Sequence, residues 1–493
     1  MFGAAPCPAP VCRCFTWNIN ICSQRIGPLI APECMRYIGN KTKLLPFIAG
    51  ALDGLGVPAG GRALDAFAGT AAVGAFLKSR GAAVVSCDLM TFSFVFQRAY
   101  VVADSYPRFS GLIDDPGLRA ARQRADFTAL VDNRVATRTA ASERATGRRA
   151  TCTATRTATR TAVRTTRVDA SRARRPAPGI AADSTRPLDE MLVYLDHYLD
   201  PLTSFVSSHF AMQHTPIPAA ATGDVLATAR TGRAGRARLG AAAPSIASPR
   251  MYFTLDAARR IDAIRTQLHD WHTSAAITDD EYYILLAALL EAADAVANTA
   301  GVYAAYIKSW QSNALRSLRL RMPVISASPR LRRSRRARCE AHLGDVSTLA
   351  PELGRFDLLY LDPPYNTRQY SAYYHVPELI AKGWFGDPPV LRGKTGLLPD
   401  AKKSEWSTRA GCVAALDRLL ATADADHVVL SYNSEGIIPE AEIKRIFRAY
   451  GRPGTYRRLT RTYQRYRSDR PSASRRYTSD SVREHLYCVR LRD

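Results

Sequence analysis

The chain has 493 residues, of which 46% are hydrophobic, and a formal net charge of +24. This hydrophobic fraction excludes a wholly disordered protein, and the length leaves room for two or more domains. The excess of basic side chains favours a polyanionic partner, most simply nucleic acid, although basic surfaces also serve membrane binding and solubility. The best apolar run, residues 282–297, carries Glu291 and Asp294, so no membrane span is expected.

The first 34 residues differ from the rest of the chain. They hold five of the ten cysteines, at spacings that do not match a paired metal-binding motif. Coherent patterning starts at Met35, so we expect residues 1–34 to be a disordered leader and Met35 to be the start of translation. A metal-binding cysteine knuckle is the alternative. Because no basic stretch precedes an apolar core, we expect no secretion signal.

Residues 35–106 alternate between strands and helices, which predicts a parallel α/β sheet. Residues 36–43 place Tyr37 and Lys41 around a glycine turn that precedes a helix. We interpret this segment as a lid over the charged end of a bound ligand, with a basic helix start as the alternative. Strands are predicted over 62–67 and 82–89, with a helix over 71–79 between them.

The first predicted strand leads into a turn of small residues at 65–70, with the sequence DAFAGT. In a doubly wound sheet, a nucleotide-like ligand meets the start of a helix at this turn. The spacing differs from GxGxxG, so a dinucleotide site is not favoured. Asp88 ends the next strand, where an acidic side chain accepts hydrogen bonds from ribose hydroxyls. Each feature alone is common at strand ends, but the pair favours a cofactor site.

Residues 107–334 interrupt the α/β pattern. Tracts at about 112–190 and 219–248 are rich in Arg, Thr and Ala with little aliphatic bulk, and we expect them to be disordered. They are either phosphate-binding arms or tolerated insertions. Order is expected again over 191–210 and in a helix from Asp279 to about residue 298, followed by a second helix that ends near Trp310.

The α/β pattern returns over residues 335–493, directly after a basic cluster at 332–338. Strands are predicted at 357–361, 427–431 and 486–491. The first of these ends in the tetrapeptide Asp362-Pro363-Pro364-Tyr365, in which the prolines fix an extended backbone with carbonyls available as acceptors. The Asp carboxylate accepts hydrogen bonds, and the Tyr ring offers a flat face for stacking.

This tetrapeptide suits one chemical task. It can grip a planar exocyclic amino group so that the nitrogen lone pair attacks an electrophile, which indicates amino-methylation of a base. A rigid turn of purely structural value is the alternative, because Asp-Pro and Pro-Pro are common after strands.

Three later segments follow the tetrapeptide in the chain, and the second of them ends a strand at the same predicted sheet edge. Residues 366–375 interleave aromatic side chains with Arg368 and suit either a loop that holds an extrahelical nucleotide or a packed loop. Residues 431–435 end another strand. Residues 463–470 are basic and aromatic, which fits a phosphate contact or a solvated hairpin. We interpret His375 and His485 as structural.

Four motifs in a fixed order, at 37–41, 65–70, 88 and 362–365, resemble the Dam-like N6-adenine DNA methyltransferases, including members of restriction systems. The resemblance covers roughly residues 35–106 and 281–493. It implies a Rossmann-like S-adenosylmethionine-dependent methyltransferase sheet in the α/β class. The cofactor half would span 35–106, an inserted, mainly helical target-recognition region 107–334, and the catalytic half 335–493.

The resemblance also implies roles for individual residues. Catalysis would fall to Asp362, Pro363, Pro364 and Tyr365. S-adenosylmethionine would contact Tyr37, Lys41, Asp65, Phe67, Gly69, Asp88, Asp345 and Asp362. The target adenine would be flipped out of the duplex, stacked on Tyr365 and held through its amino group by Asp362 and the Pro363 carbonyl. Direct in-line transfer would follow, with neither a cysteine nucleophile nor a metal ion.

The implied partner is double-stranded DNA, in a prokaryotic cytoplasm and in a restriction–modification setting that includes a cognate restriction endonuclease. Three rival functions stay open at this point. N4-cytosine in DNA and N2-guanine in RNA are alternative substrates, because related motifs serve any exocyclic amine; a serine at position 362 would have favoured cytosine. The third rival is a catalytically inactive DNA-binding protein.

Overall fold

A computed structural model describes residues 35–141, 182–212, 250–326, 338–464 and 481–491, all within one compact unit, Ala31–Asp493. The predicted leader, the second biased tract and nearly all of the basic cluster at 332–338 lie outside the described residues. So does the segment from 465 to 480. The described helices include none that is both long and apolar enough to cross a membrane.

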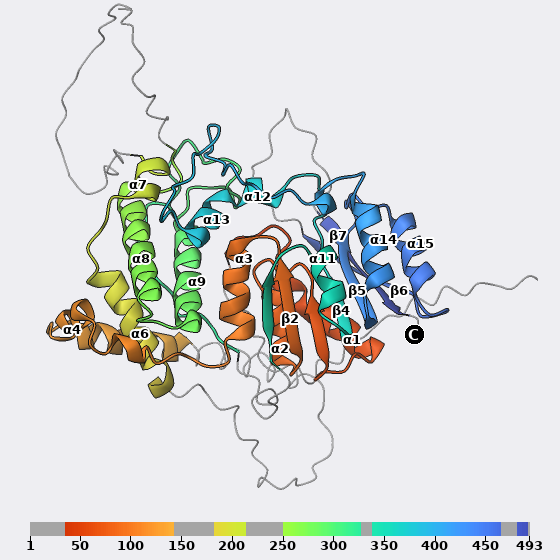
Figure 1. Cartoon of the computed structure of the whole chain (residues 1–493), viewed down its shortest axis with the longest axis horizontal. Helices are drawn as coiled ribbons and strands as arrows, with labels where there is room; N and C mark the ends of the chain where they lie inside the picture. Colours follow the sequence, from red (N-terminus) through yellow and green to blue (C-terminus); the bar gives the residue numbers. More distant parts are fainter. Residues whose placement is uncertain (1–34, 142–181, 213–249, 327–337, 465–480, 492–493) are drawn as a thin grey trace, which may run out of the picture. The chain divides into compact units, whose positions relative to one another are not determined.

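Within the described ranges, a sheet of seven strands has the order β3-β2-β1-β4-β5-β7-β6 (Figure 1). Five strands are mutually parallel, whereas β7 runs antiparallel to β5 and β6 antiparallel to β7. The strands are β1 (Arg62–Asp65), β2 (Ala83–Asp88), β3 (Glu340–Leu343), β4 (Phe356–Leu361), β5 (Ala425–Asn433), β6 (Arg457–Gln464) and β7 (Ser481–Arg490). The predicted α/β methyltransferase sheet is confirmed.

The order of the strands in the sheet determines where a ligand-binding crevice lies. From β1 the chain moves outward to β2 and β3, and it then returns to build β4 and β5 on the other side of β1. In an open parallel sheet, such a reversal leaves a crevice outside the carboxyl ends of the two central strands. The turn at 65–70 and the tetrapeptide at 362–365 follow β1 and β4, so the fold brings both predicted motifs to this crevice.

The core explains why β4 forms. Its sequence, FDLLYL, is buried except for half-buried Asp357, as expected for a central parallel strand covered on both faces. Asp357 accepts a hydrogen bond from the Arg62 backbone N–H at 2.7 Å. On one face the sheet packs against α14 (Cys412–Thr422) and the amphipathic α15 (Glu440–Tyr450).

Two helices of the cofactor half pack against β2. Helix α2 (Ala72–Ser79) follows the turn at 65–70, and α3 (Thr91–Phe96) begins just after Asp88. Both contact β2. Helix α1 (Leu45–Leu55) precedes β1 and ends at Gly56 in a left-handed conformation.

In the ranges that the structure describes, the region between β2 and β3 consists of helices joined by turns, bends and irregular segments. Its helices include α4 (Pro116–Arg122), α6 (Ala182–His197), α7 (Phe205–His209), α8 (Leu255–Thr273) and α9 (Asp279–Ala295). Helix α9 packs against α3 and against α13 (His375–Lys382) of the catalytic half. The Arg36 side chain donates to the Asp294 carboxylate at 3.1 Å and to the Asp294 carbonyl oxygen at 2.6 Å. The helical region is thereby fixed to the segment that carries Tyr37 and Lys41.

The prediction of disorder over about 112–190 is wrong at both ends of the tract. Residues 116–122, 127–141 and 182–190 are helical. Arg138 lies 3.1 Å from the buried Asp189 carboxylate, and Arg134 lies 3.3 Å from that of Asp196. These arginines neutralise buried acids of α6. The prediction of disorder from composition alone was therefore wrong for the segment that carries them.

The predicted second helix that ends near Trp310 is also wrong. Residues 299–312 form turns and bends. The Asn298 side chain donates to the Ile307 carbonyl at 2.8 Å and accepts from the Gln311 backbone N–H at 3.1 Å. An amide side chain thus takes up backbone groups that a helix would have paired internally.

The packing of α15 can be tested at Phe447, which is fully buried in the core. Phe447→Ala should lower the free energy of unfolding by about 3–5 kcal/mol, because it removes a ring and leaves a cavity. Lys444 is exposed on the same helix, so Lys444→Ala should change the free energy of unfolding by less than about 0.5 kcal/mol. Urea unfolding measures both variants. Equal losses would contradict this packing.

Candidate active site

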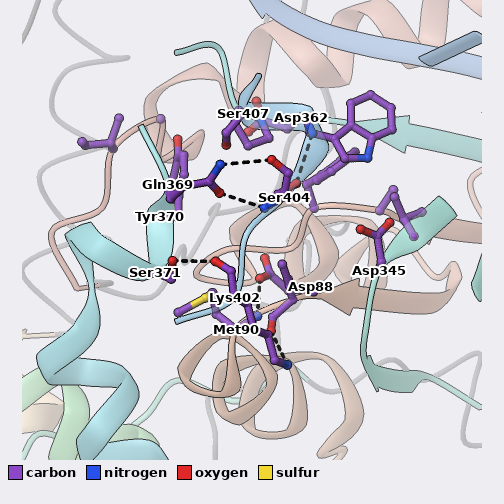
Figure 2. A pocket seen from close by; sticks show the side chains of 18 of the residues that line it. Asp88, Met90, Asp345, Asp362, Gln369, Tyr370, Ser371, Lys402, Ser404 and Ser407 are labelled. Atoms are coloured by element: carbon purple, nitrogen blue, oxygen red, sulfur yellow. Dashed lines mark hydrogen bonds between the residues drawn. The ribbon is translucent and has the colours of Figure 1, made fainter. Parts of the chain in front are cut away.

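A cavity lies at the carboxyl ends of the parallel strands (Figure 2). It holds about 750 Å³ of empty space, which includes a part open to solvent. Its wall is built from segments far apart in the chain, namely 37–39, 66–67, 88–90, 344–346, 362–365, 369–371 and 402–407. All four predicted motifs therefore contribute residues to the wall of one cavity.

Asp88 is held rigidly at the end of β2. One carboxylate oxygen accepts from the Gly69 backbone N–H at 2.9 Å, and the other accepts from the Met90 backbone N–H at the same distance. Burial raises the pKa of the Asp88 carboxyl, although these backbone donors oppose the shift. The residue lines the cavity.

Asp65 and Gly69 do not line this cavity but lie behind its wall. Asp65 is buried, and burial followed by the nearby Asp362 carboxylate raises the pKa of Asp65 to about 7. Gly69 has φ +53°, and a Cβ there would come within 2.8 Å of the Tyr37 ring. This glycine lets the turn after β1 approach Tyr37 closely.

Two aromatic side chains, Phe67 and Trp406, line the cavity. Their rings meet edge to face, with centroids 5.0 Å apart. Asp345 also lines the cavity and accepts from the Ser347 backbone N–H at 2.8 Å, which starts the short helix α11 (Val346–Leu349). Asp345 and Phe67 were predicted site residues, and both line the cavity.

Sequence reasoning missed the segment 402–407, which also lines the cavity. The Gln369 side chain donates to the Ser404 carbonyl at 3.2 Å and accepts from the Ser404 backbone N–H at 2.8 Å (Figure 2). Lys402 donates to the Leu89 carbonyl at 2.9 Å. The segment carries no local motif, apart from an isolated Trp406 that could have marked it as buried.

The tetrapeptide at 362–365 forms the wall nearest to β1. Asp362, Pro364 and Tyr365 line the cavity, whereas Pro363 is buried behind them. Tyr365 lies against Gly39, where an added Cβ would come within 2.5 Å of the Tyr365 hydroxyl. Tyr432, at the end of β5, donates to the Pro364 carbonyl at 3.4 Å. The wall is therefore braced from two sides.

Lys41 lies beneath Asp362 and is not part of the cavity wall. Its ammonium is 3.0 Å from Asp362 Oδ1 and donates a hydrogen bond to Glu484 Oε1 at 2.9 Å. It is also 5.6 Å from the centre of the Tyr365 ring. The sequence predicts that this lysine contacts the ligand's charged end, and the structure places it against two residues of the tetrapeptide, Asp362 and Tyr365.

An aromatic cluster holds the segment that carries Lys41. The Tyr37 ring stacks on Tyr374 with centroids 4.8 Å apart, and the Tyr374 hydroxyl accepts from the Ile38 backbone N–H at 2.7 Å. Burial, followed by the negative charge of Asp88, raises the pKa of the Tyr37 phenol, so it stays neutral. Residues 366–375 thus include packed aromatics, of which Tyr370 also lines the cavity.

The two histidines predicted to be structural have internal partners. His375 is buried and its Nε2 lies 2.8 Å from the Thr395 carbonyl oxygen. His485 Nδ1 lies 2.9 Å from the Thr460 hydroxyl. Neither histidine lines the cavity. Over the described part of the chain, no group of three or more His, Cys, Asp or Glu side chains could hold a metal ion.

In one cavity the geometry combines an acidic acceptor and an aromatic face, Asp362 and Tyr365, with a second acid, Asp88, and further aromatic rings. This arrangement can hold an amino group at Asp362 while an aromatic, hydroxyl-bearing ligand occupies the rest of the cavity. The parallel sheet, the cavity at its reversal point and the tetrapeptide together define a class, the α/β methyltransferases that act on amino groups.

Comparisons with known proteins give the family. The model of the D12 class N6 adenine-specific DNA methyltransferases matches residues 37–166 and 241–446. These ranges cover more than half of the chain, so the chain belongs to this family. The predicted resemblance to N6-adenine DNA methyltransferases is confirmed, and so is the expectation of an enzyme.

Individual relatives agree with the family. The chain is 35% identical over 242 residues to the Type II methyltransferase M.NlaIII of Neisseria lactamica, which is 49% of this chain and 68% of that protein. It is 37% identical over 226 residues to the Type II methyltransferase M.FokI of Planomicrobium okeanokoites, 46% of this chain and only 33% of that protein. The comparison with solved structures gave no match.

The contact between Gly39 and Tyr365 gives a testable prediction. Gly39→Ala should lower the methylation rate at least tenfold, on the order of the cost of misplacing a reacting group, because the new methyl group displaces the Tyr365 ring. Gly56→Ala is the matched control, since Gly56 also has a positive φ but no neighbouring atom within 4 Å of an added Cβ.

Both variants should lose comparable thermal stability, about 1 kcal/mol or more, from the strained backbone alone. Radiolabel transfer to DNA, normalised to folded protein, separates the two effects. Equal activity of the two variants would contradict the packing of Tyr365 on residue 39.

Proposed function

We propose that this enzyme transfers the methyl group of S-adenosylmethionine to N6 of adenine in double-stranded DNA, as the modification enzyme of a restriction–modification system. The observation that carries the proposal is the shared cavity wall, in which Asp362 and Tyr365 after β4 face the same space as Asp88 after β2. Its Type II relatives support the restriction–modification setting.

The cavity fits the proposed cofactor. Asp88 is an acceptor fixed by backbone donors at the end of β2, which suits ribose hydroxyls. The Phe67 and Trp406 rings, which line the cavity together with Asp345, suit a flat adenine ring. Tyr37 lines the adjoining wall, and Asp65 and Gly69 support the wall from behind. When bound, the cofactor supplies a methyl group on a positively charged sulfur.

Asp362 and Tyr365 would handle the target base. Adenine in a duplex must leave the base stack before its amino group can reach this cavity. The Tyr365 ring would stack on the extruded base, while Asp362 and the backbone carbonyl of Pro363 accept from the N6 amino group. Accepting these hydrogen bonds increases the electron density on the nitrogen. Because the nitrogen is also held in line with the methyl group, positioning supplies most of the rate enhancement.

The helical region at 107–334 is proposed as the target-recognition region. It lies between the cofactor and catalytic halves in the chain, and Arg36 and Asp294 fix it to the segment at 37–41. A cognate endonuclease and a cytoplasmic location belong to the same proposal. The rivals that methylate cytosine N4 or guanine N2 are left as outcomes of the experiment below.

The direct test is product analysis. The protein is incubated with methyl-labelled S-adenosylmethionine and, in parallel reactions, with unmethylated duplex DNA or with RNA, and the nucleic acid is digested to nucleosides for mass spectrometry. N6-methyldeoxyadenosine is expected. N4-methyldeoxycytidine, or label that appears only in RNA, would overturn the assignment of the base. Cofactor binding without transfer to any nucleic acid would favour a catalytically inactive protein.

Asp362→Asn should lower the methyl-transfer rate about 100-fold or more, because the amide is a weaker acceptor and presents donors toward the amine. Duplex binding in a gel-shift assay should stay within a few-fold of wild type. Asp424→Asn is the matched control. Asp424 is exposed and directly precedes β5, so it lies at the amino end of that strand, whereas the cavity lies at the carboxyl ends. Full activity of Asp362→Asn would remove the residue from catalysis.

Asp88→Ala should weaken cofactor binding about 10- to 100-fold, the cost of losing hydrogen bonds to a charged acceptor. Calorimetry with S-adenosylhomocysteine measures the affinity directly. Because the substitution removes a cofactor contact, saturating S-adenosylmethionine should restore much of the turnover. An unchanged dissociation constant would show that Asp88 does not contact the cofactor.

A further inference from the structure

Glu484 is an acidic residue buried within the sheet, in a position that no sequence motif marks. It lies on β7 opposite Asn433 of β5, and its side chain is 1% exposed. Its Oε1 accepts from the Lys41 ammonium at 2.9 Å and from the Ser431 hydroxyl at 2.7 Å. A carboxylate removed from water is costly unless it is paired, and these donors, the Lys41 ammonium above all, offset part of the cost of burying Glu484.

The ammonium of Lys41 thus lies between two carboxylates. It is 2.9 Å from Glu484 and 3.0 Å from Asp362, and all three groups are largely withdrawn from solvent. The contact with Glu484 is a well-formed hydrogen bond, with the lysine as donor. Glu484 therefore fixes where the ammonium sits, and the ammonium in turn meets Asp362 Oδ1.

We propose that Glu484 is a positioning residue for methyl transfer. It anchors Lys41 beneath the tetrapeptide, so that Lys41 engages Asp362 Oδ1 and leaves Oδ2 to accept from the target amino group. This inference rests on the proposed function, and it adds a residue from the antiparallel end of the sheet to the site.

The position of Lys41 matters for two residues of the tetrapeptide. The same ammonium lies 5.6 Å from the centre of the Tyr365 ring, within the range of a cation–π interaction. A shift of Lys41 would therefore disturb the amine acceptor and the stacking ring together. A purely structural ion pair elsewhere in the sheet would not have this effect.

Charge at Glu484 also bears on the ionisation of Asp362. Burial raises the pKa of Asp362 to about 7, with Lys41 lowering it and Glu484 raising it. Burial alone would lower the pKa of Lys41, but Asp362 and Glu484 raise it, so the lysine stays charged. The other titratable groups that interact with Asp362 are Asp65, Tyr37, Tyr360, Tyr370 and Tyr432.

The sign of the pH effect follows. Asp362 accepts more strongly from the amine when ionised, and its protonated form carries an O–H donor, so the transfer rate of wild-type enzyme should rise as pH increases through about 7. Removing the negative charge of Glu484 lowers the pKa of Asp362 and moves this rise to lower pH. Removing the positive charge of Lys41 raises that pKa and moves the rise to higher pH.

The test is the pH profile of the single-turnover transfer rate, with enzyme and S-adenosylmethionine in excess over duplex. Glu484→Gln keeps an acceptor for Lys41 and Ser431 but removes the charge. Its rate above pH 8 should fall about tenfold, because displaced groups are less well aligned for transfer. The rise of its rate with pH, here called the acid limb of the profile, should move to lower pH. Lys41→Gln should move the acid limb to higher pH.

Ser431→Ala is the matched control, because it removes a hydrogen bond to Glu484 without changing any charge. Its acid limb should coincide with that of wild type. If Glu484→Gln lowers the rate by one factor at every pH, Glu484 is only structural and the proposal fails. If Glu484→Gln does not fold, the Lys41→Gln profile decides, and an unmoved acid limb there overturns the proposal.

Failure of this inference is distinct from failure of the proposed function. An active wild-type enzyme whose variants keep the wild-type acid limb contradicts only the role of Glu484. Wild-type enzyme that forms no N6-methyldeoxyadenosine contradicts the function itself.

Discussion

The buried ammonium of Lys41 is the interaction on which the site depends. It joins three parts of the chain that are far apart in sequence, at positions 41, 362 and 484. Withdrawing these charges from water costs several kcal/mol per ion, and only good geometry among all three groups offsets that cost. The acceptor of the tetrapeptide is therefore complete only when the segment at 37–41, β4 and the late strand β7 are all in place.

The sheet and the helical region both serve this arrangement. The reversal of strand order between β1 and β4 opens the cavity, and the antiparallel β7 next to β5 brings Glu484 under it. On the other side, Arg36 bonds to Asp294 of α9, and Tyr374 holds the backbone of Ile38. The segment that carries Lys41 is thus fixed between the helical region and the catalytic half, so that the two regions meet at the lysine.

Features that depend on local sequence were predictable. The strand–turn–helix at 62–79 and the tetrapeptide after β4 have short-range signatures, and Phe67, Asp88, Asp345 and Asp362 all line the cavity. Contacts between distant segments were not predictable in the same way. Nothing near Glu484 indicates a lysine partner 443 residues away in the chain, and Lys41 was expected to meet a ligand.

The prediction of disorder from amino-acid composition failed because it, too, depends on contacts between distant segments. Counting arginines predicted disorder at the start of the biased tract, yet Arg134 and Arg138 neutralise acids on α6. Whether an arginine is solvated or paired depends on tertiary contacts that a single sequence does not display. Likewise, the Asn298 side chain bonds to the backbone of the following turn, which ended the helical pattern earlier than the spacing of apolar residues indicated.

The central claim is that Asp362 is a buried acceptor whose charge is set by Lys41 and Glu484. Carbon-13 NMR of aspartate carboxyl groups, with Asp362→Asn to identify the resonance, measures this directly. Because burial raises the pKa of Asp362 to about 7, its signal should titrate near neutral pH, and at lower pH in Glu484→Gln. An Asp362 carboxyl that titrates near pH 4, as an exposed aspartate does, and is unaffected by Glu484→Gln would contradict the account.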